Sequence, residues 1–165
     1  MFNRGDRGAK LMDELLKSLW GRIGYRLAAM RGKKTETIGI HCTAIGKVLM
    51  AWESVPRRDH ILKGCDFKRF RDKTIITRAD YDAELERTLA QGFGQDREEF
   101  DDHIRCLAVP IFDRLGLPVA GMSVSFPSFR FAAANIPEVL AELTRASREI
   151  SERLGCQQHP LKSAA

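Results

Sequence analysis

Residues 104–126, IRCLAVPIFDRLGLPVAGMSVSF, decide the fold of this chain. Two apolar stretches, Ile104–Phe112 and Val119–Phe126, flank the turn sequence Asp113-Arg114-Leu115-Gly116. Such stretches joined by a short glycine-containing turn are typical of an antiparallel hairpin. Pro110 has no backbone N–H to donate, so we expect a bulge or a sheet edge at that position. The segment therefore predicts an antiparallel sheet.

Helical patterns lie on both sides of this hairpin. Each begins at a residue that caps helices well and ends near a glycine or a charged residue. We predict helices from Thr43 to about Glu53, from Ser54 to Gly64, from Thr77 to Gly92, and from Asn135 to Gly155, with extended segments at Thr74–Ile76 and Phe93–Asp96. Strands interleaved with helices predict an α+β domain in which helices flank an antiparallel sheet.

The first 40 residues follow a different pattern. Apolar residues at steps of three and four predict an amphipathic helix over about residues 9–23. Residues 25–40 show no clear period apart from a short strand near Ile38–Ile40, and we interpret them as a linker. The predicted organisation is a basic helix and linker over 1–40, one domain over 41–156 and a tail over 157–165.

Charge is unevenly distributed along the chain. The 165 residues include 27 Lys and Arg against 22 Asp and Glu, a net charge of +5. Residues 1–40 hold nine basic and four acidic side chains, whereas residues 41–165 hold 18 of each. A chain whose whole excess lies outside the predicted domain offers no electrostatic argument that the domain itself binds nucleic acid.

Composition also bears on location and redox state. The longest uncharged stretch, Leu115–Phe129, contains two prolines and is shorter than the roughly 18–20 apolar residues that span a bilayer. The N-terminus has no apolar segment typical of a secretion signal, so we expect a cytoplasmic protein with no membrane partner. The four cysteines have no CxxC spacing, and we expect no disulfide framework.

Three kinds of chemical site are weak candidates. Gly46-Lys47 is followed by Val48, so the Ser or Thr of a phosphate-binding loop is missing. The pairs His41-Cys42 and His103 with Cys106 are poor zinc ligand sets, and we expect neither a metal nor a cofactor. A thiol nucleophile built from Asp102, His103 and Cys106 is an alternative that stays open, although such groups usually converge from distant positions.

An anion pocket is the fourth candidate. Ser123 and Ser125 are two residues apart, so both hydroxyls project from one face of a strand, and Cys106 can face them from the paired strand. The free N–H groups at the start of the helix capped by Thr43 would suit a carboxylate. The alternative is that the two hydroxyls simply bond to backbone or water on a solvated face of the sheet.

Five motifs in one order carry a family resemblance. They are HCTAIGKVLMA (41–51), TIIT (74–77), GFGQDREE (92–99), RCLAVPIFD (105–113) and GMSVS (121–125). Together they resemble the C-terminal effector-binding domain of IclR-type bacterial transcriptional regulators, over about residues 41–156. The resemblance implies a GAF-like or profilin-like sensor domain that binds a small organic acid, often a carboxylic or sugar acid, and forms homodimers or homotetramers.

The resemblance also implies a set of ligand-binding residues. Backbone N–H groups would hold a carboxylate, serine hydroxyls would donate to the ligand, an aspartate would accept from a ligand hydroxyl, and a cysteine would pack without reacting. By position these are Ala44, Ile45 and Gly46 at the helix N-terminus, then Ser123 and Ser125, Asp96, and Cys106. The leading hypothesis is thus a small-molecule-sensing regulatory domain and not an enzyme; the rival is a thiol-dependent enzyme that uses Cys106.

Two departures from the family pattern matter. His103 stands where the family commonly has glycine, which affects how that loop approaches the pocket. The residues before His41 resemble neither a winged helix-turn-helix nor the additional strands of the sensor domain. We therefore expect DNA binding only through a module absent from this chain. A truncated or rearranged gene, with part of the pocket wall and sheet edge missing, would explain the pattern, as would a remnant that keeps only its oligomerisation surface.

Overall fold

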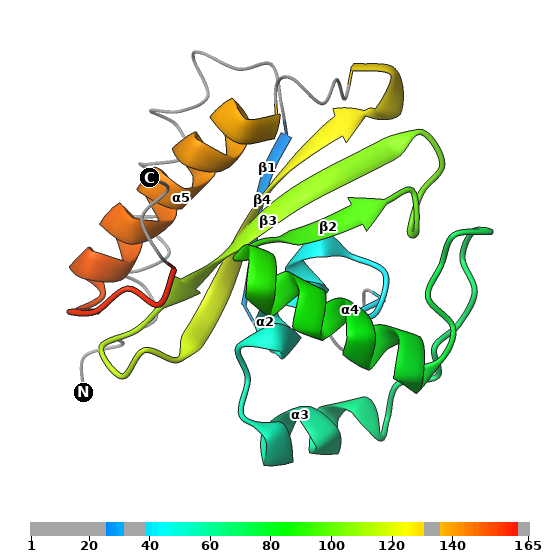
Figure 1. Cartoon of the computed structure of the whole chain (residues 1–165), viewed down its shortest axis with the longest axis horizontal. Coiled ribbons are helices and arrows are strands. Elements are labelled where there is room, and N and C mark those ends of the chain that lie inside the picture. Colours follow the sequence, from blue (N-terminus) through cyan, green and yellow to red (C-terminus); the bar gives the residue numbers. More distant parts are fainter. Residues whose placement is uncertain (1–25, 32–38, 131–135, 162–165) are drawn as a thin grey trace, which may run out of the picture.

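A four-stranded antiparallel sheet with helices on both faces organises the computed structural model, which describes residues 26–31, 39–130 and 136–161. The strand order is β1-β4-β3-β2 (Figure 1). Helix α5 covers one face, whereas α2 and α4 cover the other and α3 lies beyond them. The bounds are β1 Arg26–Arg31, α2 Ala44–Ala51, α3 Val55–Leu62, α4 Arg78–Gln91, β2 Gly94–Arg97, β3 Ile104–Phe112, β4 Pro118–Pro127, the 3-10 turn η2 Ser128–Arg130, and α5 Ile136–Arg153.

The predicted hairpin is confirmed as β3 and β4. Asp113 closes its turn, because its side-chain Oδ1 accepts the N–H groups of Leu115 at 2.8 Å and Leu117 at 3.1 Å. Pro110 pairs with Gly121 of β4 but has no partner from β2, which ends opposite Ala108. The missing N–H of Pro110 therefore lies where β3 has become a sheet edge, and a register irregularity follows at Ile111/Phe112.

The predicted helices form within a few residues of their expected limits. Thr43 and Thr77 cap α2 and α4, each accepting an N–H group of the first turn at 3.1 Å. Gly92 ends α4 with a left-handed backbone, φ 84°. Ser54 stands at the N-cap of α3, but its side chain makes no capping bond. Asn135, the predicted cap of α5, lies outside the described residues.

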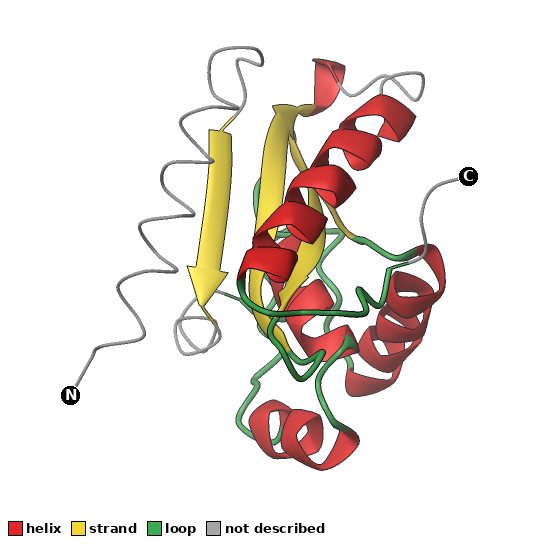
Figure 2. Ribbon diagram, turned by 90° about the vertical axis from the view of Figure 1, so that its left-hand side faces the viewer, coloured by secondary structure: helices red, strands yellow, loops and turns green. Residues whose placement is uncertain are grey.

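The prediction of a linker over residues 25–40 is wrong for Arg26–Arg31. These residues form β1, which pairs with β4 from Arg26 opposite Ser125 to Arg31 opposite Ala120 (Figure 2). The sequence RLAAMR has no strand-like alternation, so the strand owes its existence to pairing along β4. The described residues before His41 therefore do contribute a strand to the sheet.

Two other segments that we expected to be extended form no strand in the described residues. Gly39 and Ile40 belong to a turn closed by the N–H of Cys42 on the Gly39 carbonyl at 3.0 Å, so no strand forms there. Thr74–Ile76 likewise forms no strand. The amphipathic helix predicted over residues 9–23 lies outside the described residues.

The two faces of the sheet bury different cores. On the α5 face the core is formed by large apolar side chains of β3, β4 and α5, and Leu161 joins it from the segment predicted as a tail. On the other face α2 and α4 pack around Ala108, and their largest buried side chain is Tyr81. The principal members on the α5 face are Leu107, Val109, Ile111, Met122, Val124, Phe126, Leu143, Ala146 and Ile150.

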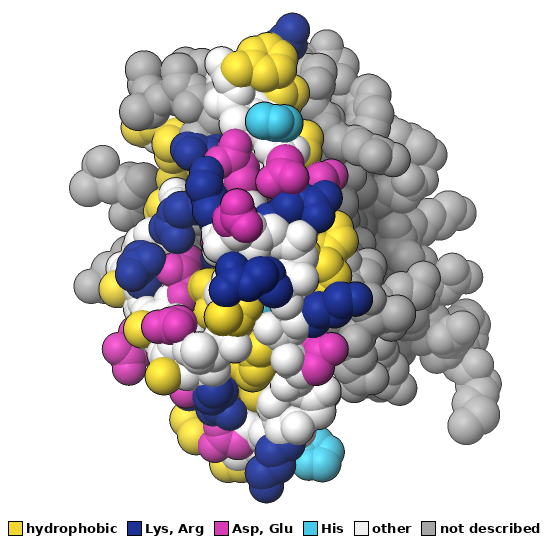
Figure 3. Space-filling view, turned by 90° about the vertical axis from the view of Figure 1, so that its right-hand side faces the viewer, with side chains coloured by type: hydrophobic (Ala, Val, Ile, Leu, Met, Phe, Trp, Pro, Cys, Tyr) yellow, Lys and Arg dark blue, Asp and Glu magenta, His cyan; other side chains and the backbone are white. Residues whose placement is uncertain are grey.

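The surface mixes charges of both signs. Figure 3 shows Lys and Arg interleaved with Asp and Glu on the side viewed there. The ion pairs Lys73–Glu98 and Arg71–Asp101 likewise join charges of opposite sign, in agreement with the balanced charge of residues 41–165. Among the described helices, none is both long enough and apolar enough to cross a membrane.

Candidate functional site

A row of polar side chains crosses the sheet on the face toward α2. Asp96 of β2 pairs with Cys106 of β3, which pairs with Ser125 of β4. The Cys106 Sγ lies 3.1 Å from the Ser125 Oγ. Ser123, two residues from Ser125, is buried, and Asp96 is only 4% exposed, whereas Cys106 and Ser125 are half-buried. The expectation that both serines share a face with Cys106 is therefore confirmed in its geometry.

The N-terminus of α2 is packed tightly against the preceding turn. Gly46 approaches Ile40 so closely that a Cβ on Gly46 would lie 2.1 Å from the Ile40 carbonyl oxygen. The N–H of Gly46 donates to the Thr43 side chain at 3.1 Å. Gly46 is therefore required for its lack of a side chain, and its own N–H is already bonded to the Thr43 hydroxyl.

Asp96 is an unusual buried carboxyl group. Its Oδ1 accepts the N–H of Glu99 at 2.8 Å, which holds the loop after β2 in place. Burial raises the pKa of Asp96 to about 6, and the negative charge of Glu99 acts in the same direction. At neutral pH the group still carries most of its charge, and a hydrogen-bond donor on a ligand would favour that state.

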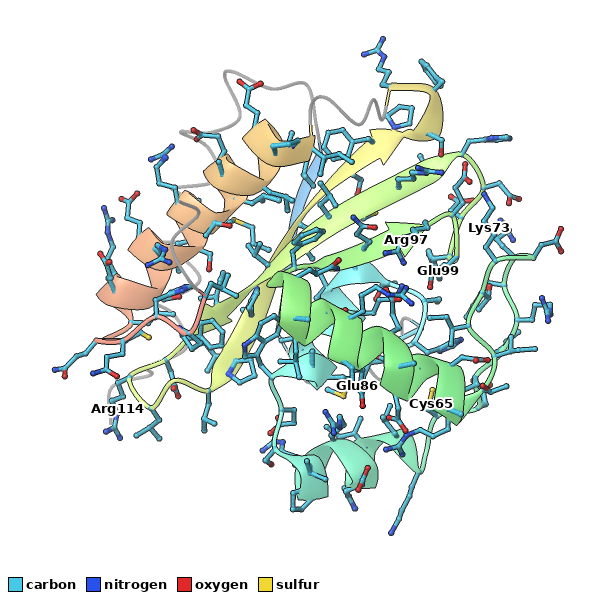
Figure 4. The ribbon with its side chains drawn as sticks, viewed as in Figure 1. Cys65, Lys73, Glu86, Arg97, Glu99 and Arg114 are labelled. Atoms are coloured by element: carbon cyan, nitrogen blue, oxygen red, sulfur yellow. The ribbon has the colours of Figure 1, made fainter. Side chains whose placement is uncertain are left out.

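A buried ion network stands behind Asp96, and sequence reasoning missed it. The ammonium of Lys47, fully buried on α2, contacts Glu99 Oε1 at 2.5 Å, the Gln95 carbonyl at 2.6 Å and Glu84 Oε1 at 3.3 Å. Glu84 also binds Arg97 at 3.1 Å. Figure 4 shows Arg97 and Glu99 on the same side of the sheet as α4.

A signal for this network was present in the sequence. Lys47 is the one charged residue in the helix AIGKVLMA, in which every residue is buried. A lysine on such a helix needs a buried partner, because an unpaired ammonium is too costly to bury. The spacing of Lys47 after Gly46, which suggests a phosphate-binding loop, draws attention away from this signal. The network ties α2 to α4 and to the loop that carries Asp96.

The loop between β2 and β3 reaches the sheet despite the histidine at position 103. His103 has a left-handed backbone, φ 61°, which glycine adopts without strain. The His103 carbonyl nevertheless accepts the N–H of Ser128 at 2.7 Å and so joins the loop to the end of β4. Glu98 strengthens this closure, because it bonds both Lys73 and the Ser128 hydroxyl. These bonds also lower the pKa of Glu98 to about 2.

The alternative chemistries find little support in this geometry. Cys106 bonds Ser125 rather than His103, and burial raises the pKa of its thiol to about 11. A thiol of this kind is a poor nucleophile. Within residues 26–31, 39–130 and 136–161, no three His, Cys, Asp or Glu side chains are arranged to hold a metal ion.

Two cavities in the described part of the chain are large enough to hold a small molecule. One, of about 580 Å³, lies beside the loop after α3, and the other, of about 620 Å³, lies between the end of α4 and α5. Neither is lined by the seven residues that the sequence predicts to bind a ligand. Their role in binding therefore stays a prediction.

Comparison with known proteins identifies the family to which this architecture belongs. The family model described as the bacterial transcriptional regulator IclR C-terminal domain matches residues 25–152. The chain belongs to the IclR family. The match begins before β1, so it includes the strand that the sequence led us to interpret as a linker.

Individual members of the IclR family resemble this chain in both sequence and structure. The HTH-type transcriptional regulator KdgR of Escherichia coli is 40% identical over 121 residues, which cover 73% of this chain and 46% of that protein. The crystal structure of the C-terminal domain of E. coli KdgR has a TM-score of 0.83 and 32% identity, and covers 90% of this chain and 98% of that one.

The Thermotoga maritima IclR structure has a TM-score of 0.84 at 26% identity, covering 92% of this chain and 70% of that one. These structures confirm the α+β fold predicted from the sequence. The relatives are transcriptional regulators with an effector-binding C-terminal domain, and none supports the thiol-dependent enzyme. The chain spans less than half the length of the KdgR proteins that it matches.

Proposed function

We propose that this IclR-type domain binds a small carboxylate or sugar acid between the start of α2 and the polar face of the sheet. The ligand carboxylate would accept the N–H groups of Ala44 and Ile45, where the helix dipole favours negative charge. Ser123 and Ser125 would donate to the ligand, and Asp96 would accept from a ligand hydroxyl.

The observation that carries the proposal is the polar row itself. Asp96, Cys106 and Ser125 align across three strands, on the face of the sheet toward α2 and opposite the apolar α5 face. Polar groups buried inside a small domain normally serve a structural bond or a ligand. The Lys47 network supports the assignment, because it fastens α2 to the loop that holds Asp96.

Isothermal titration of the full chain tests the proposal. Pyruvate, gluconate and glucuronate sample short and polyhydroxylated acids, and we expect at least one to bind. Ser123→Ala or Ser125→Ala should each weaken that binding about 10- to 100-fold, the effect of one lost hydrogen bond to a charged or polar ligand group.

Ser147→Ala is the matched control for these two variants. Ser147 is fully buried, but it lies on α5, and its hydroxyl donates to the Pro110 carbonyl at 2.5 Å. Its substitution should lower stability and leave affinity unchanged. A folded sample that binds no small acid would contradict the proposal, as would equal losses of affinity for all three serine variants.

We further propose that the domain acts within a cytoplasmic regulator that forms a homodimer or homotetramer and reaches DNA through another module. Effector binding then changes regulation only if the two states of the assembly bind the effector with different affinity. Light scattering with size-exclusion chromatography, in the presence and absence of the acid that binds, measures the assembly directly. A monomer under both conditions would contradict this part.

A further inference from the structure

A cysteine and a histidine meet at the cavity of about 580 Å³, away from the polar row. Cys65 follows the end of α3, and Figure 4 shows it beneath α4. His41 lies in the turn before α2 and is 2% exposed. The Cys65 Sγ is 3.6 Å from the His41 Nδ1. His60, Ile61, Asp66, Lys68 and Phe70 also line this cavity.

The hydrogen bonds of His41 determine which ring nitrogen carries the proton. Its Nε2 is 2.9 Å from the Lys68 carbonyl oxygen, which can only accept, so Nε2 is the donor. The Nδ1 of the neutral ring is then the acceptor, and the Cys65 thiol donates to it. The rings of Phe67 and Phe70, at centroid distances of 5.4 and 5.9 Å, fix the imidazole from the side.

This arrangement has the three parts of an activated nucleophile. A thiol touches a base, and a third group orients the base. We propose that Cys65 is a covalent binding site for α,β-unsaturated carbonyl compounds, with His41 as its base and the cavity as the place where the compound sits. The proposal does not depend on the effector site.

The reaction is an addition in which nothing is oxidised or reduced. As the Cys65 sulfur attacks the β-carbon, the thiol proton moves to the His41 Nδ1 and an S–C bond forms. The π electrons of the C=C bond move toward the carbonyl as an enolate. The imidazolium then returns the proton to the α-carbon, so the products are a thioether and a neutral His41.

The surroundings of Cys65 explain why the base is needed. Burial raises the pKa of the Cys65 thiol, so the sulfur stays protonated at neutral pH until a base removes the proton. Ile61 and Phe70 supply apolar contact for a carbon skeleton, and Lys68 offers a donor to its carbonyl oxygen. The cavity therefore combines a nucleophile, a base and room for a small organic molecule.

The other cysteines lack this combination. Cys42 is fully buried and donates to the Gly39 carbonyl at 3.2 Å, and Cys156 is buried in the α5-face core. Cys106 is half-buried like Cys65, but its partner is the hydroxyl of Ser125. Cys106 is therefore the internal standard for the reactivity of Cys65 within one sample.

Methyl vinyl ketone is a suitable probe. The full chain is exposed to it between about pH 5.5 and 9, quenched and digested, and the adduct at each cysteine is quantified by mass spectrometry. We expect Cys65 to react at least about tenfold faster than Cys106, because general-base assistance contributes about a hundredfold or more. The Cys65 rate should rise with pH and then level off below about pH 9, because the neutral base, and not free thiolate, limits the reaction.

Several charged or titratable groups face the pair of Cys65 and His41. His60 comes from α3, Asp66 and Lys68 from the following loop, and Tyr81 from α4. The fifth such group is Cys42, which follows His41 in the sequence and interacts electrostatically with Cys65. None of these groups would turn a Cys65 rate that levels off with pH into one that keeps rising. A Cys65 rate that keeps rising through pH 9, or that never exceeds the Cys106 rate, overturns the proposal.

His41→Gln provides the matched variant, since glutamine can still donate to the Lys68 carbonyl but has no basic nitrogen. We expect the Cys65 rate to fall at least about tenfold while the Cys106 rate is unchanged. An unchanged Cys65 rate overturns the role of His41. If the variant unfolds, all four cysteines react alike, and the pH profile and rate ratio of the unmodified chain decide the question.

Discussion

The two faces of the sheet show how one hairpin can serve two purposes. On the α5 face β3 and β4 present Leu107, Val109 and Met122, all without exposed surface. On the opposite face the alternate residues of the same strands are Cys106, Ser123 and Ser125. Because successive side chains of a strand point to opposite faces, a stable core and a polar site can be built from adjacent residues.

The faces also differ in what holds them together. Burial of apolar surface stabilises the α5 face, at roughly 25 cal/mol for each Å² removed from water. The α2 face instead encloses Lys47, Glu84 and Glu99, whose charges must compensate one another because water is excluded. We infer that the polar face is the more fragile of the two, and that its geometry depends on electrostatic balance.

Breaking the buried network should have the largest effect. Lys47→Met leaves the carboxylate of Glu99 buried without its cation, and loss of one partner of a buried ion pair costs about 3–5 kcal/mol. Urea unfolding followed by circular dichroism measures the free energy of unfolding.

The double variant Lys47→Met/Glu99→Gln separates lost charge balance from lost packing. The neutral amide removes the uncompensated charge, so part of the stability should return. A cost for Lys47→Met below about 1 kcal/mol, or a double variant less stable than Lys47→Met, would show that the network is not balanced as the structure indicates.

Adjacent residues of β3 allow a direct test of the two faces. Leu107→Ala removes a fully buried side chain from the α5 face and should cost about 2–5 kcal/mol. Cys106→Ala, one residue earlier, removes a smaller group and one hydrogen bond, so it should cost about 1 kcal/mol.

The effects on ligand binding should be reversed. With the acid identified by titration, Cys106→Ala should change affinity, whereas Leu107→Ala should leave the affinity of the folded fraction unaltered. If Leu107→Ala weakens binding as much as Cys106→Ala does, the two faces are not independent and the comparison fails.

Local chemistry explains why most of the fold could be predicted from sequence. Thr43, Thr77 and Gly92 determine helix ends through their own side chains or lack of one, and Asp113 closes its own turn. Interactions of this kind need only neighbouring residues, so the sequence displays them. The paired placement of Cys106 and Ser125 followed from strand alternation and a short turn in the same way.

Long-range interactions explain what could not be predicted. β1 forms because β4, about 90 residues later, offers it a free edge, and its own sequence has no strand pattern. Lys47 meets Glu84 and Glu99 across 37 and 52 residues, and nothing local indicates which carboxylates will be its partners. Such contacts arise only when the chain is packed.

The acidity of Asp96 predicts a pH-dependent contrast. Its pKa is raised in the fold from 3.8 to about 6, so the folded state binds the proton more tightly than the unfolded state does. The resulting stability is complete below about pH 3.8 and is lost as the pH rises through 6. Asp96→Asn keeps an acceptor for the Glu99 N–H and does not titrate.

Relative to the unmodified chain, Asp96→Asn should therefore gain stability between pH 4 and 7, by up to about 3 kcal/mol at 1.36 kcal/mol per pKa unit. Urea unfolding of both proteins at pH 4, 5, 6 and 7 measures the difference. A difference that does not change with pH, or that changes in the opposite direction, would mean that Asp96 is not desolvated in the folded protein.

His103 offers the smallest and most local test of the polar face. Its backbone φ of 61° strains a residue that has a Cβ, and its exposed side chain makes little contact to lose. His103→Gly relieves that strain but gives the unfolded chain more freedom. The net expectation is a gain of about 0.5–1 kcal/mol in the free energy of unfolding.

Gly116→Ala is the converse substitution in the turn between β3 and β4. Gly116 has φ 72°, and a Cβ there would meet no atom within 4 Å, so its cost reports the backbone strain without any steric clash. That cost should be about 1 kcal/mol, opposite in sign to the effect of His103→Gly. If His103→Gly destabilises the protein while Gly116→Ala behaves as expected, the His103 side chain contributes to holding the loop beside Asp96, and the polar face depends on more than charge balance.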